Sequence, residues 1–174
     1  MSQFTIPPTL EHRNIPLDRL RELYPRKRIT VGVAIVSRDQ PRKLLLLRRS
    51  ADEETLPNMY ELPGGNCDPE DGTVLDAVAR ETREETGLVV AEILREFAEF
   101  EYSTKRGPAM QLNFLVRVQM PGGYSPESLI PTLNPEEHQA YVWLESLELL
   151  ESLPMTPGMK GVVANALEAT SNLT

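Results

Sequence analysis

The sequence predicts an α+β fold, a class in which helices and strands are mixed without regular strand–helix–strand alternation. Two observations support this prediction. Separate runs of β-branched or alternating apolar residues indicate several strands, and other segments space their apolar residues as helices do. The length of 174 residues suits a single domain, and 40% hydrophobic with 25% charged residues is typical of globular proteins.

The first 25 residues are expected to form an arm and a short helix, followed by one domain over residues 26–174. Residues 1–15 are predicted to be extended, because Ile6-Pro7-Pro8 disfavours a helix. Residues 16–24 space three leucines at helical intervals, and Pro25 ends that helix. Strands are then expected at residues 29–37 (ITVGVAIVS), 43–49 (KLLLLRR) and 59–62, the second of which could run antiparallel to the first.

The second half of the chain begins with an acidic helix. Residues 73–86 have helical spacing, with Asp71 or Thr73 as the N-terminal cap and Gly87 suited to the C-terminal end. Residues 88–102 and 110–118 are expected to pair as a hairpin. The remaining predicted elements are an irregular Pro-rich loop at 120–135, a strand at 140–144 and helices at 145–151 and 158–170.

Composition narrows the classes of function. Asp and Glu number 26 against 18 Lys and Arg, and the net charge of −8 argues against a protein dedicated to duplex nucleic acid or an anionic membrane surface. Cys67 is the only cysteine, so an intrachain disulfide and Cys-rich zinc sites are excluded. No segment resembles a signal peptide or approaches the roughly 20 apolar residues of a membrane span. We therefore expect a cytoplasmic protein.

Acidic residues gather in one short segment. Residues 68–85 hold seven acidic and two basic residues, a local charge of −5. A helix turns by about 100° per residue, so Glu84 and Glu85 lie at about −60° and about 40° from Glu81. Three carboxylates thus share one sector and repel one another in the absence of a cation. Oxygen ligands of this kind suit Mg²⁺ or Mn²⁺, which also bind substrate phosphates.

A glycine turn precedes this helix, and the two together resemble a known motif. Leu62-Pro63-Gly64-Gly65 permits backbone conformations that let a ligand approach the main chain closely. The whole segment is similar to the Nudix box, written G-x5-E-x7-R-E-U-x-E-E-x-G-U, where U is a bulky aliphatic residue. The chain supplies Gly65, Asp71, Arg80-Glu81, Glu84-Glu85, Gly87 and Leu88.

Three positions depart from the box. Asp71 stands where glutamate is usual, one extra residue, assigned to Gly72, separates it from Arg80, and Thr82 replaces an aliphatic residue. The match covers residues 64–88 and leaves R-E-x-x-E-E-x-G intact. The resemblance implies a Nudix-type α/β/α sandwich, in which helices flank a mixed β-sheet.

The resemblance also implies hydrolysis of a diphosphate linked to another group, by attack of water on phosphorus with Mg²⁺ or Mn²⁺ as the cofactor. The metal ligands carried over by position are Glu81, Glu84, Glu85 and the Gly64 carbonyl. Arg80 would orient the glutamates. The general base would be Glu81 or an acid outside the box, for which Glu136 or Glu137 is the candidate. The alternative interpretation of these two residues is that they are exposed loop acids without a catalytic role.

Substrate contacts are expected at the Gly64-Gly65 turn and at two arginines. Arg48 follows the LLLL run, where the family often has a phosphate-contacting arginine, and a solvated strand end is an equal alternative. Arg28 could line the same opening of the substrate site, although a solvent-exposed position beside the strand is favoured. His138 is interpreted as structural.

The preferred function is hydrolysis of a nucleoside diphosphate-type substrate. The same chemistry on a non-nucleotide diphosphate, such as an isoprenoid diphosphate, stays open, as does a Nudix-fold module that binds ligand without turnover. The expected partner is a small-molecule diphosphate rather than a membrane or duplex nucleic acid, and both a monomer and a homodimer are compatible with the sequence.

Overall fold

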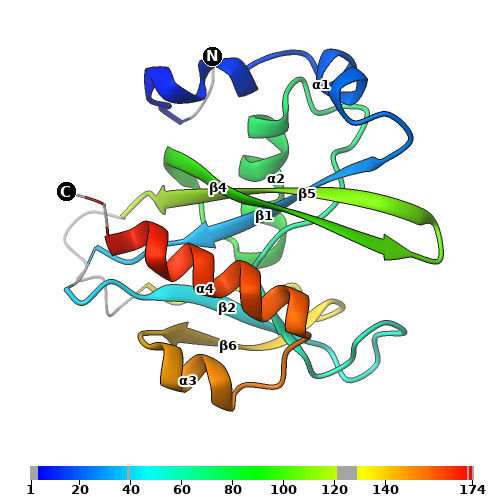
Figure 1. Cartoon of the computed structure of the whole chain (residues 1–174). Coiled ribbons are helices and arrows are strands. Elements are labelled where there is room, and N and C mark those ends of the chain that lie inside the picture. Colours follow the sequence, from blue (N-terminus) through cyan, green and yellow to red (C-terminus); the bar gives the residue numbers. More distant parts are fainter. Residues whose placement is uncertain (1–3, 39, 121–128, 172, 174) are drawn as a thin grey trace.

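The computed structural model describes residues 4–38, 40–120, 129–171 and 173, over which helices and strands are mixed (Figure 1). In chain order the elements are η1 (Pro8–Arg13, a 3-10 helix), α1 (Leu17–Leu23), β1 (Arg28–Ile35), β2 (Leu44–Arg49), β3 (Tyr60–Glu61), α2 (Val74–Thr86), β4 (Val90–Thr104), β5 (Gly107–Val118), β6 (His138–Leu144), α3 (Leu147–Ser152) and α4 (Pro157–Ser171). The predicted α+β class is confirmed. None of the helices in these ranges is long and apolar enough to span a bilayer.

The strands form two three-stranded sheets. In the first, with the order β1-β5-β4, β1 runs parallel to β5 and β4 runs antiparallel to it. In the second, with the order β3-β2-β6, both outer strands run antiparallel to β2. The first sheet is therefore mixed, as expected. The predicted antiparallel contact between β1 and β2 is limited to one bridge between Val36 and Leu44.

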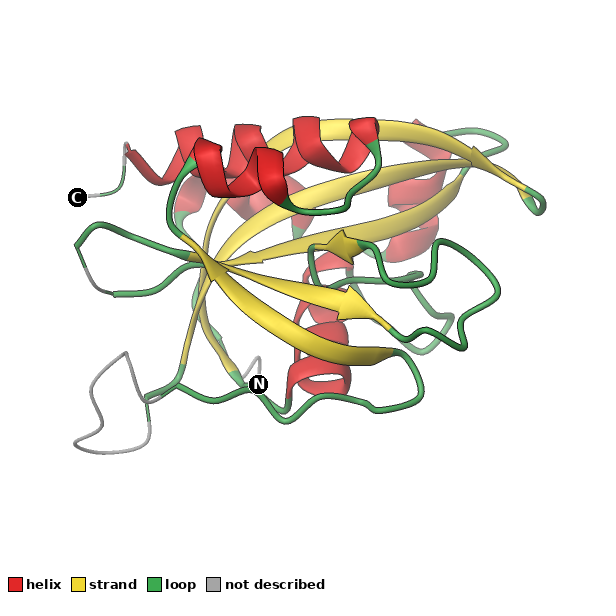
Figure 2. Ribbon diagram, turned by 90° about the horizontal axis from the view of Figure 1, so that it is seen from below, coloured by secondary structure: helices red, strands yellow, loops and turns green. Residues whose placement is uncertain are grey.

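Helices flank both sheets, which confirms the predicted α/β/α sandwich (Figure 2). Successive strand residues point to opposite faces, so β1 and β2 serve two separate cores. Val33 and Leu45 belong to the core covered by α2, whereas Ala34 and Leu46 belong to the core covered by α3 and α4. Burial on both faces explains why KLLLLRR is a continuous apolar run rather than an alternating one.

The predicted hairpin is confirmed as β4 and β5, which pair antiparallel from Val90↔Val118 to Thr104↔Gly107. Its register shifts at three places along β4, so this strand is long and bulged. The partly described loop between β5 and β6 was expected at 120–135, and its residues 121–128 lie outside the described part of the chain.

The N-terminal segment differs from the extended arm that the sequence predicts. Residues 8–13 form η1, because Pro8 at the first helical position lacks only an N–H that would be unbonded there. Leu10 is 1% exposed and belongs to the core beneath α2. Arg13 donates hydrogen bonds to Glu96, Glu99 and Tyr24, which fasten the segment to β4 and α1.

Helix α2 begins and ends where the sequence predicts. The Thr73 hydroxyl accepts from the Asp76 amide at 3.2 Å, and the Asp76 carboxylate accepts from the Thr73 amide at 2.9 Å, which forms a capping box. Gly87 ends the helix in the left-handed conformation, with φ of +68°. Beyond the helix, the Thr132 amide donates to the Thr86 carbonyl at 2.8 Å, so the chain entering β6 is held against this end of α2.

Candidate active site

Two of the three helix carboxylates are buried against the glycine turn. Glu81 is 8% exposed and Glu85 is 5% exposed, whereas Glu84 lies at the exposed edge of the same helix face. The Gly64 amide donates to Glu85 Oε2 at 2.8 Å. A Cβ on Gly65 would lie 2.5 Å from Glu81 Oε1, so the Glu81 carboxylate would have to shift. Glycine at residue 65 therefore lets this carboxylate lie directly against the turn.

Strand β1 fixes the position of the glycine turn. The Val31 amide donates to the Gly65 carbonyl at 2.8 Å, and the Val33 amide donates to the Pro63 carbonyl at 2.7 Å. Gly64 has a φ of +149°, a conformation that favours glycine, and a Cβ there would lie 2.1 Å from the Val31 carbonyl oxygen. Sheet hydrogen bonds thus hold the Gly64-Gly65 segment beside the two buried carboxylates.

Arg80 connects the acidic residues of the box. Its Nε and Nη2 bind both oxygens of Asp71 at 3.0 and 2.9 Å, a bidentate geometry that fixes the guanidinium plane. Its Nη1 donates to Glu81 at 3.0 Å and to Glu84 at 2.9 Å. Asp71 is itself buried, so the aspartate at this departure from the usual pattern is the anchor of the arginine.

The other two departures are accommodated locally. The Gly72 carbonyl accepts a hydrogen bond from the Leu17 amide at 3.2 Å, so the extra residue contacts the start of α1. Thr82 is fully buried, and its hydroxyl donates to the Val78 carbonyl at 2.7 Å, one helical turn earlier. The hydroxyl is therefore satisfied within the helix and needs no partner in the core.

Burial strongly perturbs both inner carboxylates. Burial raises the pKa of Glu81 to about 7, although the neighbouring Arg80 favours the charged form. Burial also raises the pKa of Glu85 well above its ordinary value, opposed by the Gly64 amide and reinforced by the negative charges of Glu61, Glu81 and Glu137. A divalent cation would favour the charged form of both groups.

Two side chains that the sequence analysis did not assign to the site also lie there. The His138 ring Nε2 lies 3.0 Å from Glu61 Oε1, and Arg49 Nη1 donates to the same oxygen at 2.9 Å. His138 is 2% exposed. One signal in the sequence was the position of Glu61 directly before the Leu-Pro-Gly-Gly turn, and another was the position of His138 directly after the predicted acid Glu137.

Of the two candidate acids outside the box, the structure brings Glu137 to the site. Glu85, Glu137 and His138 each offer one ligand atom, and these atoms lie within 4.8 Å of one another. The Glu137 side chain accepts a hydrogen bond from Asn134 Nδ2 at 3.0 Å. Glu136 is exposed and is not a member of this group.

The two predicted substrate-binding arginines are held by neighbouring side chains. Arg28 donates to Asn66 Oδ1 and to Thr104 Oγ1, each at 2.8 Å, and Asn66 follows the glycine turn directly. Arg48 donates to the carbonyl and side-chain oxygens of Asn58 at 3.2 and 3.3 Å. Arg28 therefore lies beside the turn, and Arg48 lies on β2 next to the loop that precedes β3.

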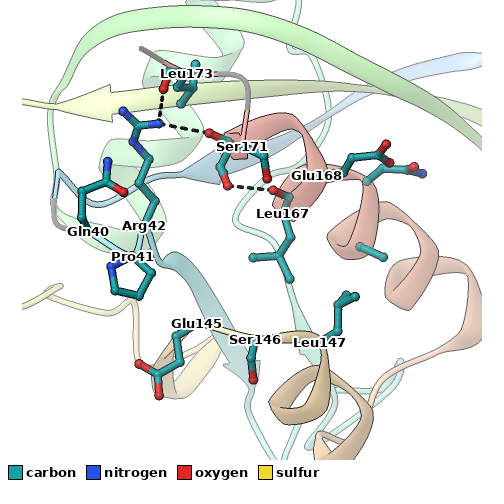
Figure 3. Close-up of a pocket in the computed structure, with 13 residues that line it drawn as sticks. Gln40, Pro41, Arg42, Glu145, Ser146, Leu147, Leu167, Glu168, Ser171 and Leu173 are labelled. Carbon is teal, nitrogen blue, oxygen red and sulfur yellow. Dashed lines mark hydrogen bonds between the residues drawn. The ribbon is translucent and has the colours of Figure 1, made fainter.

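A pocket of about 700 Å³ lies away from these residues, between the turn before β2, the start of α3 and the end of α4 (Figure 3). Arg42 is one of the lining residues and donates to the carbonyl of Thr170, in the last turn of α4, and to that of Leu173, just beyond the helix. None of the residues that line it belongs to the Gly-Gly turn, to α2 or to the Glu61–His138 pair. The acidic site and this pocket are thus separate features.

Comparison with known proteins gives matches over most of the chain. A family model described as NUDIX domain matches residues 26–166. The CTP pyrophosphohydrolase of Escherichia coli (strain K12) is 31% identical over 131 residues, which are 75% of this chain and 85% of that protein. An m7GpppN-mRNA hydrolase of Danio rerio, NUDT17, is 43% identical over 60 residues, which are 34% of this chain. The chain spans only about a fifth of the length of this last relative and of its counterparts in Xenopus laevis and Bos taurus.

Solved structures share the fold at lower identity. A MutT protein from Methanosarcina mazei Go1 has a TM-score of 0.63 at 23% identity, covering 84% of this chain and 96% of that one. A C. elegans Ap4A hydrolase, solved as a binary complex, has a TM-score of 0.63 at 22% identity, covering 84% and 99%. With the family match over residues 26–166 and the intact R-E-x-x-E-E-x-G segment on α2, the chain belongs to the NUDIX domain family.

Proposed function

We propose that the protein hydrolyses a nucleoside diphosphate-type substrate, by attack of water on phosphorus, with Mg²⁺ or Mn²⁺ as its cofactor. The observation that carries this proposal is the pair of buried carboxylates, Glu81 and Glu85, packed against the Gly64-Gly65 turn. The relationship to a CTP pyrophosphohydrolase over 85% of that protein favours a nucleotide as the substrate.

The side chains present fit a hard divalent cation. Glu81 and Glu85 supply carboxylate oxygens, which are the ligands that Mg²⁺ and Mn²⁺ prefer. Burial raises the pKa of both groups, and a bound cation would oppose that effect by favouring their charged forms. Glu84 and the Gly64 carbonyl complete the proposed ligand set. When bound, the metal would neutralise the diphosphate and acidify the attacking water.

The remaining roles follow from the contacts of the protein. Arg80 is anchored by Asp71, so it holds the Glu81 carboxylate at a fixed position rather than moving with it. The Gly64 amide fixes one oxygen of Glu85 in the same way. We assign the general base to Glu137, because it is an exposed carboxylate that lies beside the buried Glu85.

Arg28 and the glycine turn are assigned to substrate binding. Arg28 reaches the turn through Asn66, and its Nε is buried without a hydrogen-bond partner within the described residues. An anionic phosphate would satisfy such a donor. Arg48 lies farther along β2 and is assigned to the same role. A cytoplasmic location and the number of subunits stay predictions.

The proposal is tested with a substrate panel run in ¹⁸O-labelled water. The panel contains CTP, other nucleoside triphosphates, a dinucleoside tetraphosphate, ADP-ribose and isopentenyl diphosphate, each with Mg²⁺ or Mn²⁺. We expect release of labelled phosphate products from a nucleotide, and loss of at least 100-fold in turnover for both Glu81→Gln and Glu85→Gln. Glu70→Gln, an exposed acid of the same segment, serves as the matched control and keeps full activity.

Other outcomes contradict the proposal in distinct ways. Full activity of either glutamine variant would contradict the metal-ligand assignment. Turnover of isopentenyl diphosphate alone would identify a non-nucleotide substrate. Binding of nucleotides without hydrolysis of any compound, in the presence of either metal, would show a ligand-binding module.

A further inference from the structure

Basic side chains gather at one end of the first sheet, where β1 begins and the β4–β5 hairpin turns (Figure 1). Five residues make up this basic end: Arg26, Lys27, Arg28, Lys105 and Arg106. Lys105 and Arg106 are exposed in the hairpin turn. Within the described residues, Lys27 is the one base of the five that pairs with a carboxylate, that of Glu101 at 2.7 Å. The basic end is therefore positive, although the whole chain has a net charge of −8.

Hydrogen bonds connect the basic end to the candidate active site. Arg28 Nη2 donates to Thr104 Oγ1 at 2.8 Å, and the same oxygen accepts from the Arg106 amide at 3.1 Å. Arg28 Nη1 donates to Asn66 Oδ1 at 2.8 Å, and the Asn66 carbonyl accepts from Arg80 Nη2 at 2.9 Å. The Arg28 guanidinium therefore lies between the hairpin turn and the acidic helix.

The basic end lies away from the place where a diphosphate would be hydrolysed. The Val31 amide is hydrogen-bonded to the Gly65 carbonyl, and Arg28 lies three residues earlier in β1. At about 3.3 Å per residue, this separates the main chain of Arg28 from the glycine turn by about 10 Å. The hairpin turn lies on the far side of the Arg28 side chain. A ligand that reaches it needs a phosphate beyond those held at the glycine turn.

An aromatic side chain lies on the same face of the sheet. The Tyr102 hydroxyl donates to Thr30 Oγ1 at 3.3 Å. Arg28 and Thr30 point to the same face of β1, so the Tyr102 ring lies on the face that carries the guanidinium. The ring is partly exposed and stacks on Phe100, with centroids 5.5 Å apart. Rings beside cationic groups suit single-stranded nucleic acids, because bases stack on the rings and phosphates pair with the cations.

We propose that the basic end binds a short single-stranded nucleic acid whose 5′ di- or triphosphate lies at the candidate active site. Tyr102 stacks on a base, and Lys105 and Arg106 pair with phosphates of the nucleotides that follow. The inference rests on the proposed function and deepens it, because it extends the substrate beyond one nucleotide. A duplex is excluded from this surface, since its bases stack on one another and offer no free face to the ring.

Equilibrium binding tests the proposal without relying on turnover. One probe is a single-stranded RNA tetranucleotide with a 5′ triphosphate whose bridging oxygens are replaced by methylene groups, which prevents hydrolysis. The other is the matching methylene-bridged mononucleotide. Both are titrated by calorimetry in the presence of Mg²⁺. We expect the wild type to bind the tetranucleotide at least tenfold more tightly than the mononucleotide.

The hairpin turn is tested by removing its two cations together. Lys105→Gln with Arg106→Gln is expected to abolish the preference for the tetranucleotide and to leave mononucleotide binding unchanged. The slope of log affinity against log salt concentration should fall by about 1.4, because each phosphate contact on a single strand contributes about 0.7. Arg19→Gln with Arg21→Gln removes two exposed cations from α1 and is the matched control, in which the preference persists.

The aromatic contact is tested separately. Tyr102→Leu removes the ring and is expected to weaken tetranucleotide binding at least fivefold. Tyr102→Phe keeps the ring and loses only the hydrogen bond to Thr30, so it should bind as the wild type does. Equal loss in both variants, or no loss in Tyr102→Leu, would contradict stacking on this ring.

Three results would overturn the proposal as a whole. They are equal affinity of the wild type for both probes, an unchanged preference in the double variant of the hairpin turn, and equal weakening of both probes in that variant. The last result would assign Lys105 and Arg106 to the 5′ phosphates themselves. Hydrolysis of mononucleotides alongside any of these results leaves the proposed function standing. Preferential tetranucleotide binding by a protein that hydrolyses no nucleotide supports the inference and rejects the proposed function.

Discussion

Replacing Glu81 by glutamine should stabilise the metal-free protein at pH 8 while it abolishes catalysis. Burial raises the pKa of Glu81 from an ordinary value of 4.5 to about 7, and the side chain is 8% exposed. The folded state therefore binds the proton more tightly than the unfolded chain does. Protonation of Glu81 therefore stabilises the folded protein, and this stabilisation is complete below pH 4.5 and is lost as the pH rises through 7.

The size of the stability change follows from the difference between the folded and unfolded pKa values of Glu81. At about 1.4 kcal/mol per pKa unit, ionisation of Glu81 in the folded protein costs about 3 kcal/mol at pH 8. Glutamine keeps an oxygen for Arg80 and never ionises, so we expect a gain of about 2–3 kcal/mol in the free energy of unfolding. For a domain of this size the melting temperature would rise by roughly 5–10 °C.

The assay is urea unfolding with EDTA at pH 5 and pH 8, followed by circular dichroism. Glu81→Gln should exceed the wild type at pH 8 and differ little from it at pH 5. Glu84→Gln, on the exposed edge of the same helix, should change stability by less than about 1 kcal/mol. Excess Mn²⁺ should then stabilise the wild type, by about 2.7 kcal/mol at a hundredfold excess over the Kd, and the variant much less. A variant no more stable than the wild type at pH 8 in EDTA would refute the reasoning.

Three further predictions concern residues that surround the candidate site. Gly65→Ala would place a methyl group 2.5 Å from Glu81 Oε1, so Mn²⁺ affinity measured by calorimetry should fall by at least tenfold. Asp71→Asn removes the buried charge that binds Arg80 in a bidentate manner, and should lower stability in urea by about 2–3 kcal/mol; an unchanged midpoint would contradict the anchor role. Cys67 is buried and its pKa is raised to about 12, so iodoacetamide at pH 8 should label it only after unfolding, and rapid labelling of the native protein would contradict this burial.

Much of the fold could be predicted because local chemistry determines it. The limits of α2 follow from a threonine cap and a C-terminal glycine, both of which act within one helical turn. The β4–β5 hairpin follows from alternation on either side of a short turn. The N-terminal segment could not be predicted in the same way, because the burial of Leu10 and the ion pairs of Arg13 depend on a strand some 80 residues away.

The candidate site also has features that local sequence predicts and features that depend on the tertiary structure. Helical spacing predicts that Glu81, Glu84 and Glu85 share one sector, but the glycine turn covers only part of it, so Glu84 stays exposed. The significance of Asp71 was also hidden, since a departure from the motif does not reveal that the aspartate binds Arg80.

The sequence by itself determined the class of fold, the acidic helix and the Pro-Gly-Gly turn, since each depends on residues that are close along the chain. Only the tertiary structure brought Glu61 and His138 together. The sheet order β3-β2-β6 pairs Glu61 with Leu47 and His138 with Arg49, two positions on one face of β2. Because strand order sets which distant residues become neighbours, the sequence could indicate that each residue lies near the site but not that the two side chains contact each other.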